Sequence, residues 1–189
     1  MGIYLQDSIN WSCHIEYIIP KLSSACYVLR SIKPIMTIST LKTVYYSHFN
    51  AIITNGLPFW GNSPHSTKIF KMQKRIVRIM TGYINRVSFK RLEILPFTSQ
   101  YILSLMLFVV KNKHFFIFNS ENHTKRTRQL NNLYHPITNL TAYQRGLHYM
   151  GIRIFNNLPH TLTLKYYRWC ILYNSFSYFC LTSIYVNLP

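Results

Sequence analysis

The stretch KIFKMQKRIVRIM, residues 68–80, combines five positively charged residues with seven large apolar ones and contains no acidic residue. At about 100° per residue, the cations fall on one arc of about 120° of a helix, and the apolar side chains lie on the other side with Gln73 among them. The spacing therefore predicts an amphipathic helix over residues 66–81 that ends at Gly82. Its cations are Lys68, Lys71, Lys74, Arg75 and Arg78.

The basic side of this helix is expected to face outward, because its apolar side has packing partners close in sequence. Arg86, Lys90 and Arg91 would extend the positive charge beyond the helix end. Three interpretations are open: a solvated surface, a helix that lies on a membrane, and a surface that contacts phosphates. Solvated surfaces normally mix acids with bases, so contact with phosphates fits best. Since no base-reading motif is present, we expect this contact to be independent of nucleic-acid sequence.

The charge balance of the whole chain also favours a polyanionic partner. Among the 189 residues, Lys and Arg number 21 and Asp and Glu only 4, which gives a formal net charge of +17. A surplus of this size favours nucleic acid or an acidic membrane face. Hydrophobic residues make up 49% of the chain and aromatic residues 16%, so the chain can bury a core and is not expected to be disordered.

The acidic residues are too few and too scattered for metal-dependent catalysis. They are Asp7, Glu16, Glu93 and Glu121. Two-metal phosphoryl or nucleotidyl transfer needs several carboxylates that converge, and a glycosidase needs a pair. The spacing of the cysteines is not that of a zinc site, so we interpret them as reduced thiols. They are Cys13, Cys26, Cys170 and Cys180. We therefore expect no catalytic residue, no metal site and no cofactor.

Helical spacing recurs along the chain, so the predicted fold is mainly α, a small helical bundle. One helix is predicted over Ser12–Ile32, in which Pro20 should cause a kink or a split. Another should run from about residue 38 to residue 54. A short connection should pass through Val87 and Ser88. The last long helix should run from about residue 99 to residue 116, with an apolar stretch at the buried centre of the bundle.

The two ends of the chain have a different character from the bundle, which is predicted over residues 13–118. Residues 1–12 alternate like a short strand that lacks a partner. Residues 119–159 should form a basic loop and a short amphipathic element. Residues 160–189 form an apolar tail without a charged residue after Arg168. Polar residues interrupt this tail, so an irregular tail is favoured over a membrane anchor, which is the alternative.

Several ordered motifs are similar to one protein family. They are GIYLQDSINWSCHI, KLSSACYVLRSIKP, NGLPFWGNS, IFKMQKRIVRIMTG, LEILPFTSQYILSLMLFVVKN and YMGIRIFNNLP. The most telling residues are Trp11 with His14, Phe59-Trp60-Gly61, Gln73-Lys74-Arg75 with Arg78, and Asn156 with Leu158-Pro159. Over residues 1–159 the chain resembles the region C-terminal to the palm in reverse transcriptases of insect non-LTR retrotransposons of the jockey type, which are RNA-directed DNA polymerases.

This resemblance implies that residues 1–12 correspond to the last palm strand, and that the thumb and a helical extension follow. The thumb of that family is a helical unit that grips the template–primer duplex through its backbone. By position, the implied phosphate contacts are Lys71, Lys74, Arg75 and Arg78. The chain departs from the family because the paired Asp motif of the palm is absent, so it is expected to begin inside the palm. It is also shorter than the family between Arg86 and Leu92, and the family's basic helix is not recognisable after Pro159.

The leading hypothesis is therefore a non-catalytic remnant of a retrotransposon reverse transcriptase that binds template–primer nucleic acid through its phosphates. The alternative is a basic nucleic-acid-binding or architectural protein without a polymerase role. A tail-anchored membrane protein is a third, less favoured hypothesis. We expect the chain to act inside the cell, in the nucleus or the cytoplasm, without a small-molecule substrate.

Overall fold

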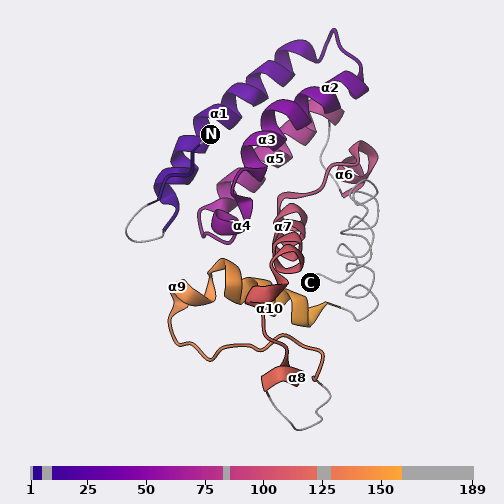
Figure 1. The fold of residues 1–189 in the computed structure, drawn as a ribbon. Coiled ribbons are helices and arrows are strands. Elements are labelled where there is room, and N and C mark those ends of the chain that lie inside the picture. Colours follow the sequence, from indigo (N-terminus) through magenta and orange to yellow (C-terminus); the bar gives the residue numbers. More distant parts are fainter. Residues whose placement is uncertain (1, 6–9, 83–85, 123–128, 159–189) are drawn as a thin grey trace. The chain divides into compact units, whose positions relative to one another are not determined.

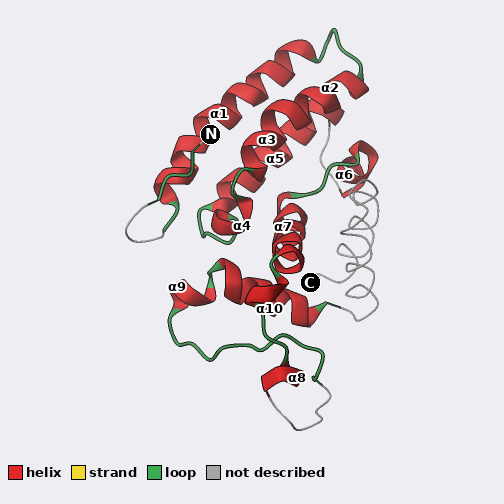
Figure 2. Cartoon of the chain, in the orientation of Figure 1, coloured by secondary structure: helices red, strands yellow, loops and turns green. Residues whose placement is uncertain are grey.

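The computed structural model describes residues 2–5, 10–82, 86–122 and 129–158. Over these residues the chain is mainly α-helical and contains no strand, which confirms the predicted fold class (Figures 1 and 2). The chain divides into two compact units, with the boundary between Tyr101 and Ile102. The helix that carries the row of cations belongs to the first unit.

Helix α1, Ser12–Ile32, has the bounds that the sequence predicts. Apolar side chains that recur every three or four residues are buried along one side of it, among them Ile15, Leu22 and Leu29. The predicted split at Pro20 does not occur. Pro20 lies on the exposed side of the helix, where water can bond the carbonyl group that has lost its usual N–H partner.

The helix predicted over residues 38–54 is present, but its middle is a π-helix. It comprises α2 (Ile38–Val44), the π-helical η1 (Tyr45–Asn50) and α3 (Ala51–Thr54). Tyr45 and Phe49 on η1 are buried, with their rings stacked at 5.5 Å between centroids. A π turn widens the helix and shifts the direction of the side chains that follow it, so 3.6-residue spacing alone does not predict this arrangement.

One short helix connects this segment to the cationic helix. Gly56, at φ 66°, precedes α4, Leu57–Trp60, whose Trp60 ring is buried against Phe97 at 5.7 Å between centroids. Helix α5, Ser66–Thr81, then packs alongside α1 (Figure 1). Ser63 lies just before α5 and donates a hydrogen bond of 3.3 Å to the carbonyl of Asn10, which lies just before α1. The two helices therefore begin at the same end of the unit.

The connection expected around Val87 and Ser88 is instead a helix, α6, Arg86–Leu92. Phe89, Leu92 and Ile94 are buried, so packing within the first unit stabilises this segment. The helix is too short for its apolar spacing to be recognised in the sequence. Helix α7, Phe97–Lys111, follows and starts two residues earlier than the predicted position 99. Its predicted continuation to residue 116 is replaced by a 3₁₀ turn, η2, Lys113–Phe115.

The second unit contains the end of α7 and three further helices. They are α8 (Asn119–Asn122), α9 (Thr141–Gln144) and α10 (Leu147–Asn157). The Asn156 side chain of α10 accepts a hydrogen bond from the Leu133 N–H and donates one to the Leu133 carbonyl, each at 2.9 Å. Phe116 stacks on His148 of α10 at 4.8 Å between ring centroids. The first contact holds Leu133, between α8 and α9, against α10, and the second holds the residue Phe116, before α8, against the same helix.

The strand expected over residues 1–12 is not formed by residues 2–5 and 10–11, which have no regular secondary structure. A strand needs a neighbouring strand to bond its backbone groups, and the described part of the chain supplies none. Instead, the Tyr4 N–H donates a hydrogen bond of 3.3 Å to His14 Nδ1 on α1. The tail over residues 160–189 lies outside the described residues.

Candidate nucleic-acid interface

The five cations of α5 lie on its exposed side, as the sequence predicts. Lys68, Lys71, Lys74, Arg75 and Arg78 are all exposed, and together they are called the α5 cationic row below. On the opposite side, Ile69, Ile76, Val77 and Met80 are buried. Burial of these side chains fixes the rotation of α5, and this rotation turns the cationic row towards solvent.

No member of the α5 cationic row forms an ion pair within the parts of the chain that the structure describes. Lys74 instead places its Nζ 4.4 Å from the centroid of the Phe70 ring, one turn back on the same helix. The row contains no acid, so its like charges repel one another unless an anion lies nearby. Such a surface is arranged to attract an anion rather than to neutralise itself.

The α5 cationic row runs along the helix axis, within an arc of about 120° of its surface. With a rise of about 1.5 Å per residue, Lys68 and Arg78 are separated by about 15 Å along this axis. Each strand of double-helical DNA carries a phosphate about every 3.4 Å along its axis. The row is thus as long as a run of about four successive phosphates of one strand.

A buried glutamine at the centre of the apolar side fixes the position of α5. Gln73 donates from Nε2 to the Tyr45 hydroxyl at 3.0 Å and to the Leu95 carbonyl at 2.9 Å. Its Oε1 accepts a hydrogen bond of 2.7 Å from the Phe97 N–H. Burial raises the pKa of Tyr45 well above its ordinary value. These bonds join α5 to η1 and to the start of α7 at the point where all three helical segments meet.

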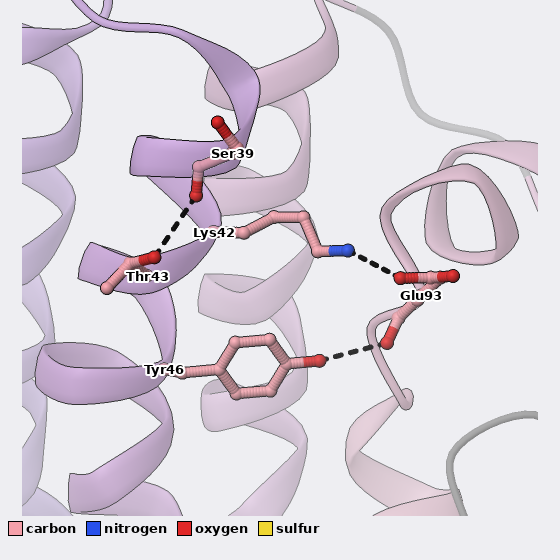
Figure 3. Close-up of polar contacts among 5 residues, drawn as sticks. All are labelled: Ser39, Lys42, Thr43, Tyr46 and Glu93. Carbon is pink, nitrogen blue, oxygen red and sulfur yellow. Dashed lines mark hydrogen bonds and ion pairs between the residues drawn. The ribbon is translucent and has the colours of Figure 1, made fainter. Parts of the chain in front are cut away.

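A second polar connection joins α2 and η1 to the end of α6 (Figure 3). Lys42 Nζ lies 2.6 Å from a carboxylate oxygen of Glu93, and the Tyr46 hydroxyl donates a hydrogen bond of 2.9 Å to the Glu93 carbonyl. Glu93 has a φ of 55°, which is the left-handed conformation that usually requires glycine after a helix. The two contacts compensate for this unfavourable conformation and occupy the charge of Lys42, which therefore does not contribute to the α5 cationic row.

The glycine after α5 stops the helix at the predicted place. Gly82 has a φ of 86°, and its N–H donates a hydrogen bond of 2.8 Å to the carbonyl of Arg78. A residue without a side chain adopts this left-handed conformation without steric cost. The last turn thus closes directly behind Arg78, and the α5 cationic row ends there.

Arg30 on α1 extends the positive surface, although the sequence analysis did not identify it. Burial raises the pKa of the Cys26 thiol, and the positive charges of Arg75 and Arg30 partly oppose this shift. Arg30 follows Cys26 by one turn on α1 and is exposed on the last turn of this helix. Arg30 and the α5 cationic row lie on neighbouring helices only because α1 packs beside α5, and no local sequence pattern indicates this pairing.

The remaining predicted site residues belong to α6. Lys90 and Arg91 are exposed on its last turn, and Arg86 begins the helix. The sequence predicts an irregular connection here, and the structure has a helix instead. That these three residues extend the positive charge of α5 stays a prediction. The structure thus assigns eight predicted residues to two helices, five on α5 and three on α6.

Other kinds of site are not supported by the side chains that the structure describes. Within them, no group of three or more His, Cys, Asp or Glu residues is placed to hold a metal ion. Among the helices described, none is both long enough and apolar enough to cross a membrane. Of the two cysteines that the structure describes, Cys13 is exposed and Cys26 is buried. The absence of catalysis therefore stays a prediction from the acid count.

Comparison with protein-family models, with curated proteins and with solved structures gave no significant match for this chain.

Proposed function

We propose that this chain binds double-stranded nucleic acid through backbone phosphates, with the α5 cationic row as the main contact. The observation that carries the proposal is a row of five exposed cations on one side of α5, without an acidic partner in the described chain. Each Lys or Arg that contacts a phosphate releases condensed counterions, so this surface favours a polyanion without reading its sequence. The net charge of +17 adds long-range attraction for the same partner.

Within this proposal, the chain is a non-catalytic remnant of a retrotransposon reverse transcriptase. Support comes from the motif order in the sequence and from a helical unit that presents cations on one side, as a polymerase thumb does. Among the described residues, no cluster of carboxylates is placed to bind the metal ions that nucleotide transfer needs. Incubation of the chain with template–primer, deoxynucleotides and magnesium should give no primer extension. Extension above the level of a no-protein control would overturn the non-catalytic part of the proposal.

The binding part is tested by fluorescence anisotropy with a labelled duplex over a range of salt concentrations. We expect the affinity to fall steeply as salt rises, with a slope of about 0.9 per phosphate contact on a log–log plot. The variant K71Q/R78Q removes two cations of the row. Its slope should be smaller by about 1.8, which is two contacts at about 0.9 each.

A matched control separates specific contact from general charge. R145Q/R153Q removes the same number of charges from exposed positions in the second unit. It should lower the affinity by less than K71Q/R78Q and should leave the slope close to that of the unmodified chain. Equal slopes for the two double variants would mean that the α5 cationic row is not the contact.

A further inference from the structure

The connection between α1 and α2 is a hydrogen-bonded turn that carries exposed apolar side chains. In this turn, residues 33–38, Ile35 is 81% exposed, Met36 46% and Ile38 46%. Its backbone is fixed, because the N–H groups of Ile35 and Met36 donate hydrogen bonds of 3.1 and 3.0 Å to the carbonyl of Ile32. The Thr37 hydroxyl then caps α2 by accepting a bond of 3.4 Å from the Thr40 N–H. The turn therefore presents its apolar side chains to solvent and cannot collapse to cover them.

The charged residues nearest to this turn along the chain are all positive. Arg30 and Lys33 precede Ile35 and are exposed, and no acid lies between residues 17 and 92. Because α1 and α5 begin at the same end of the unit, Arg78, on the last turn of α5, is the member of the α5 cationic row nearest in helix direction to the α1–α2 connection. Figure 1 shows α1 and α5 side by side, with this connection at the end of α1. The apolar turn thus lies beyond the Arg78 end of the α5 cationic row.

We propose that Ile35 and Met36 act as an apolar wedge that enters the minor groove of the duplex held by the α5 cationic row. This inference rests on the proposed function and adds a second mode of contact to it. Proteins that bend DNA often insert Ile, Met or Pro side chains between base pairs while cations hold the adjacent phosphates. Wedge insertion unstacks a base step, so pyrimidine–purine steps, which unstack most easily, are the preferred positions.

The shape of the charged surface favours a duplex over a membrane. A turn that enters a lipid surface has its cations beside the inserted apolar side chains, at the level of the headgroups. Here the cations form a line that leads away from Ile35 along α5, through Arg78 to Lys68. A line of charge matches a rod-shaped polyanion that runs along the helix and ends at the turn.

The test uses the full chain and a DNA duplex of about 24 base pairs that carries one central TA step and a fluorescence donor and acceptor at its ends. The unmodified chain should raise energy transfer, because a bend shortens the distance between the ends. I35S/M36S should abolish the bend and weaken binding about tenfold, while the salt slope stays unchanged. The control I137S/L140S replaces two exposed apolar residues of the second unit and should change neither quantity.

The outcomes separate the wedge from the proposed function. The wedge would be refuted if the unmodified chain bound the duplex without bending it, or if I35S/M36S still bent it. In either case, a smaller salt slope for K71Q/R78Q would still support phosphate binding. A chain that binds no duplex at low salt would refute the proposed function itself. Cosedimentation with vesicles that contain anionic lipid tests the membrane alternative. If I35S/M36S lost cosedimentation but bent the duplex as the unmodified chain does, the turn would be assigned to membranes and the wedge would be refuted. Both serine substitutions lie at exposed positions, so thermal unfolding should be unchanged.

Discussion

Replacement of Gln73 by leucine should destabilise the first unit more than any surface change on α5. Leucine is close to glutamine in size and is a good helix former, so the backbone of α5 should be retained. The substitution removes one acceptor and the donor of two hydrogen bonds. It leaves the Tyr45 hydroxyl, the Leu95 carbonyl and the Phe97 N–H without this partner.

The magnitude follows from these three groups. Each buried polar group that loses its partner costs about 1–3 kcal/mol, which gives about 3–9 kcal/mol for three. Burial of the leucine side chain offsets about 1.5–3 kcal/mol of this cost. At the middle of these ranges a cost of about 6 kcal/mol is offset by about 2 kcal/mol, so the free energy of unfolding should fall by about 4 kcal/mol, a large part of the about 5–15 kcal/mol that is typical of a folded domain.

Urea unfolding followed by circular dichroism measures this loss. Lys71→Leu, on the exposed side of the same helix, is the control and should change stability by less than about 0.5 kcal/mol. Tyr45→Phe in the Gln73→Leu background should cost less than it does alone, because the hydroxyl has already lost its partner, and the difference should be about 1 kcal/mol. A loss below about 1 kcal/mol for Gln73→Leu, or full additivity with Tyr45→Phe, would refute the assigned network.

Three further predictions concern polar contacts in the two units. Glu93→Ala should lower stability by about 0.5–1 kcal/mol, because it loses the partly exposed ion pair with Lys42, whereas Glu93→Gly should be close to neutral because glycine adopts the positive φ without strain and this gain offsets the lost pair. Urea midpoints of the two variants test this order, and an equal loss would refute it. Burial raises the pKa of Tyr45, so the unfolded chain loses this proton first; the stabilisation is complete below about pH 10 and is lost as pH rises further, by up to about 1.4 kcal/mol per pH unit. Tyr45→Phe should therefore make stability fall less steeply between about pH 10 and pH 11.5, and an unchanged slope would contradict this assignment. Asn156→Ala should destabilise the second unit by about 2–3 kcal/mol, because it removes both hydrogen bonds to the Leu133 backbone, and hydrogen exchange at the Leu133 amide should accelerate; unchanged protection of that amide would count against the contact.

The sequence alone determined the features that depend on neighbours within a few turns of one helix. The bounds of α1 and α5 follow from apolar side chains that recur every three or four residues, and the stop at Gly82 follows from one residue type. The outward direction of the α5 cationic row also follows from local spacing, because charge and apolar surface occupy opposite sides of one helix. These properties need no knowledge of where the chain returns.

The tertiary structure alone decided the features that depend on residues far apart in sequence. The three partners of Gln73 lie between 22 and 28 residues away, and Arg30 belongs to a helix beside the α5 cationic row only because α1 packs against α5. The α6 helix and the π-helical η1 are likewise held by packing, since short or wide helical turns gain too little from their own hydrogen bonds. Local periodicity fixes which side of a helix is buried, but long-range contact selects the side chains that meet there. Long-range contact thus gives the KIFKMQKRIVRIM helix its position in the unit and places it beside α1, which carries Arg30.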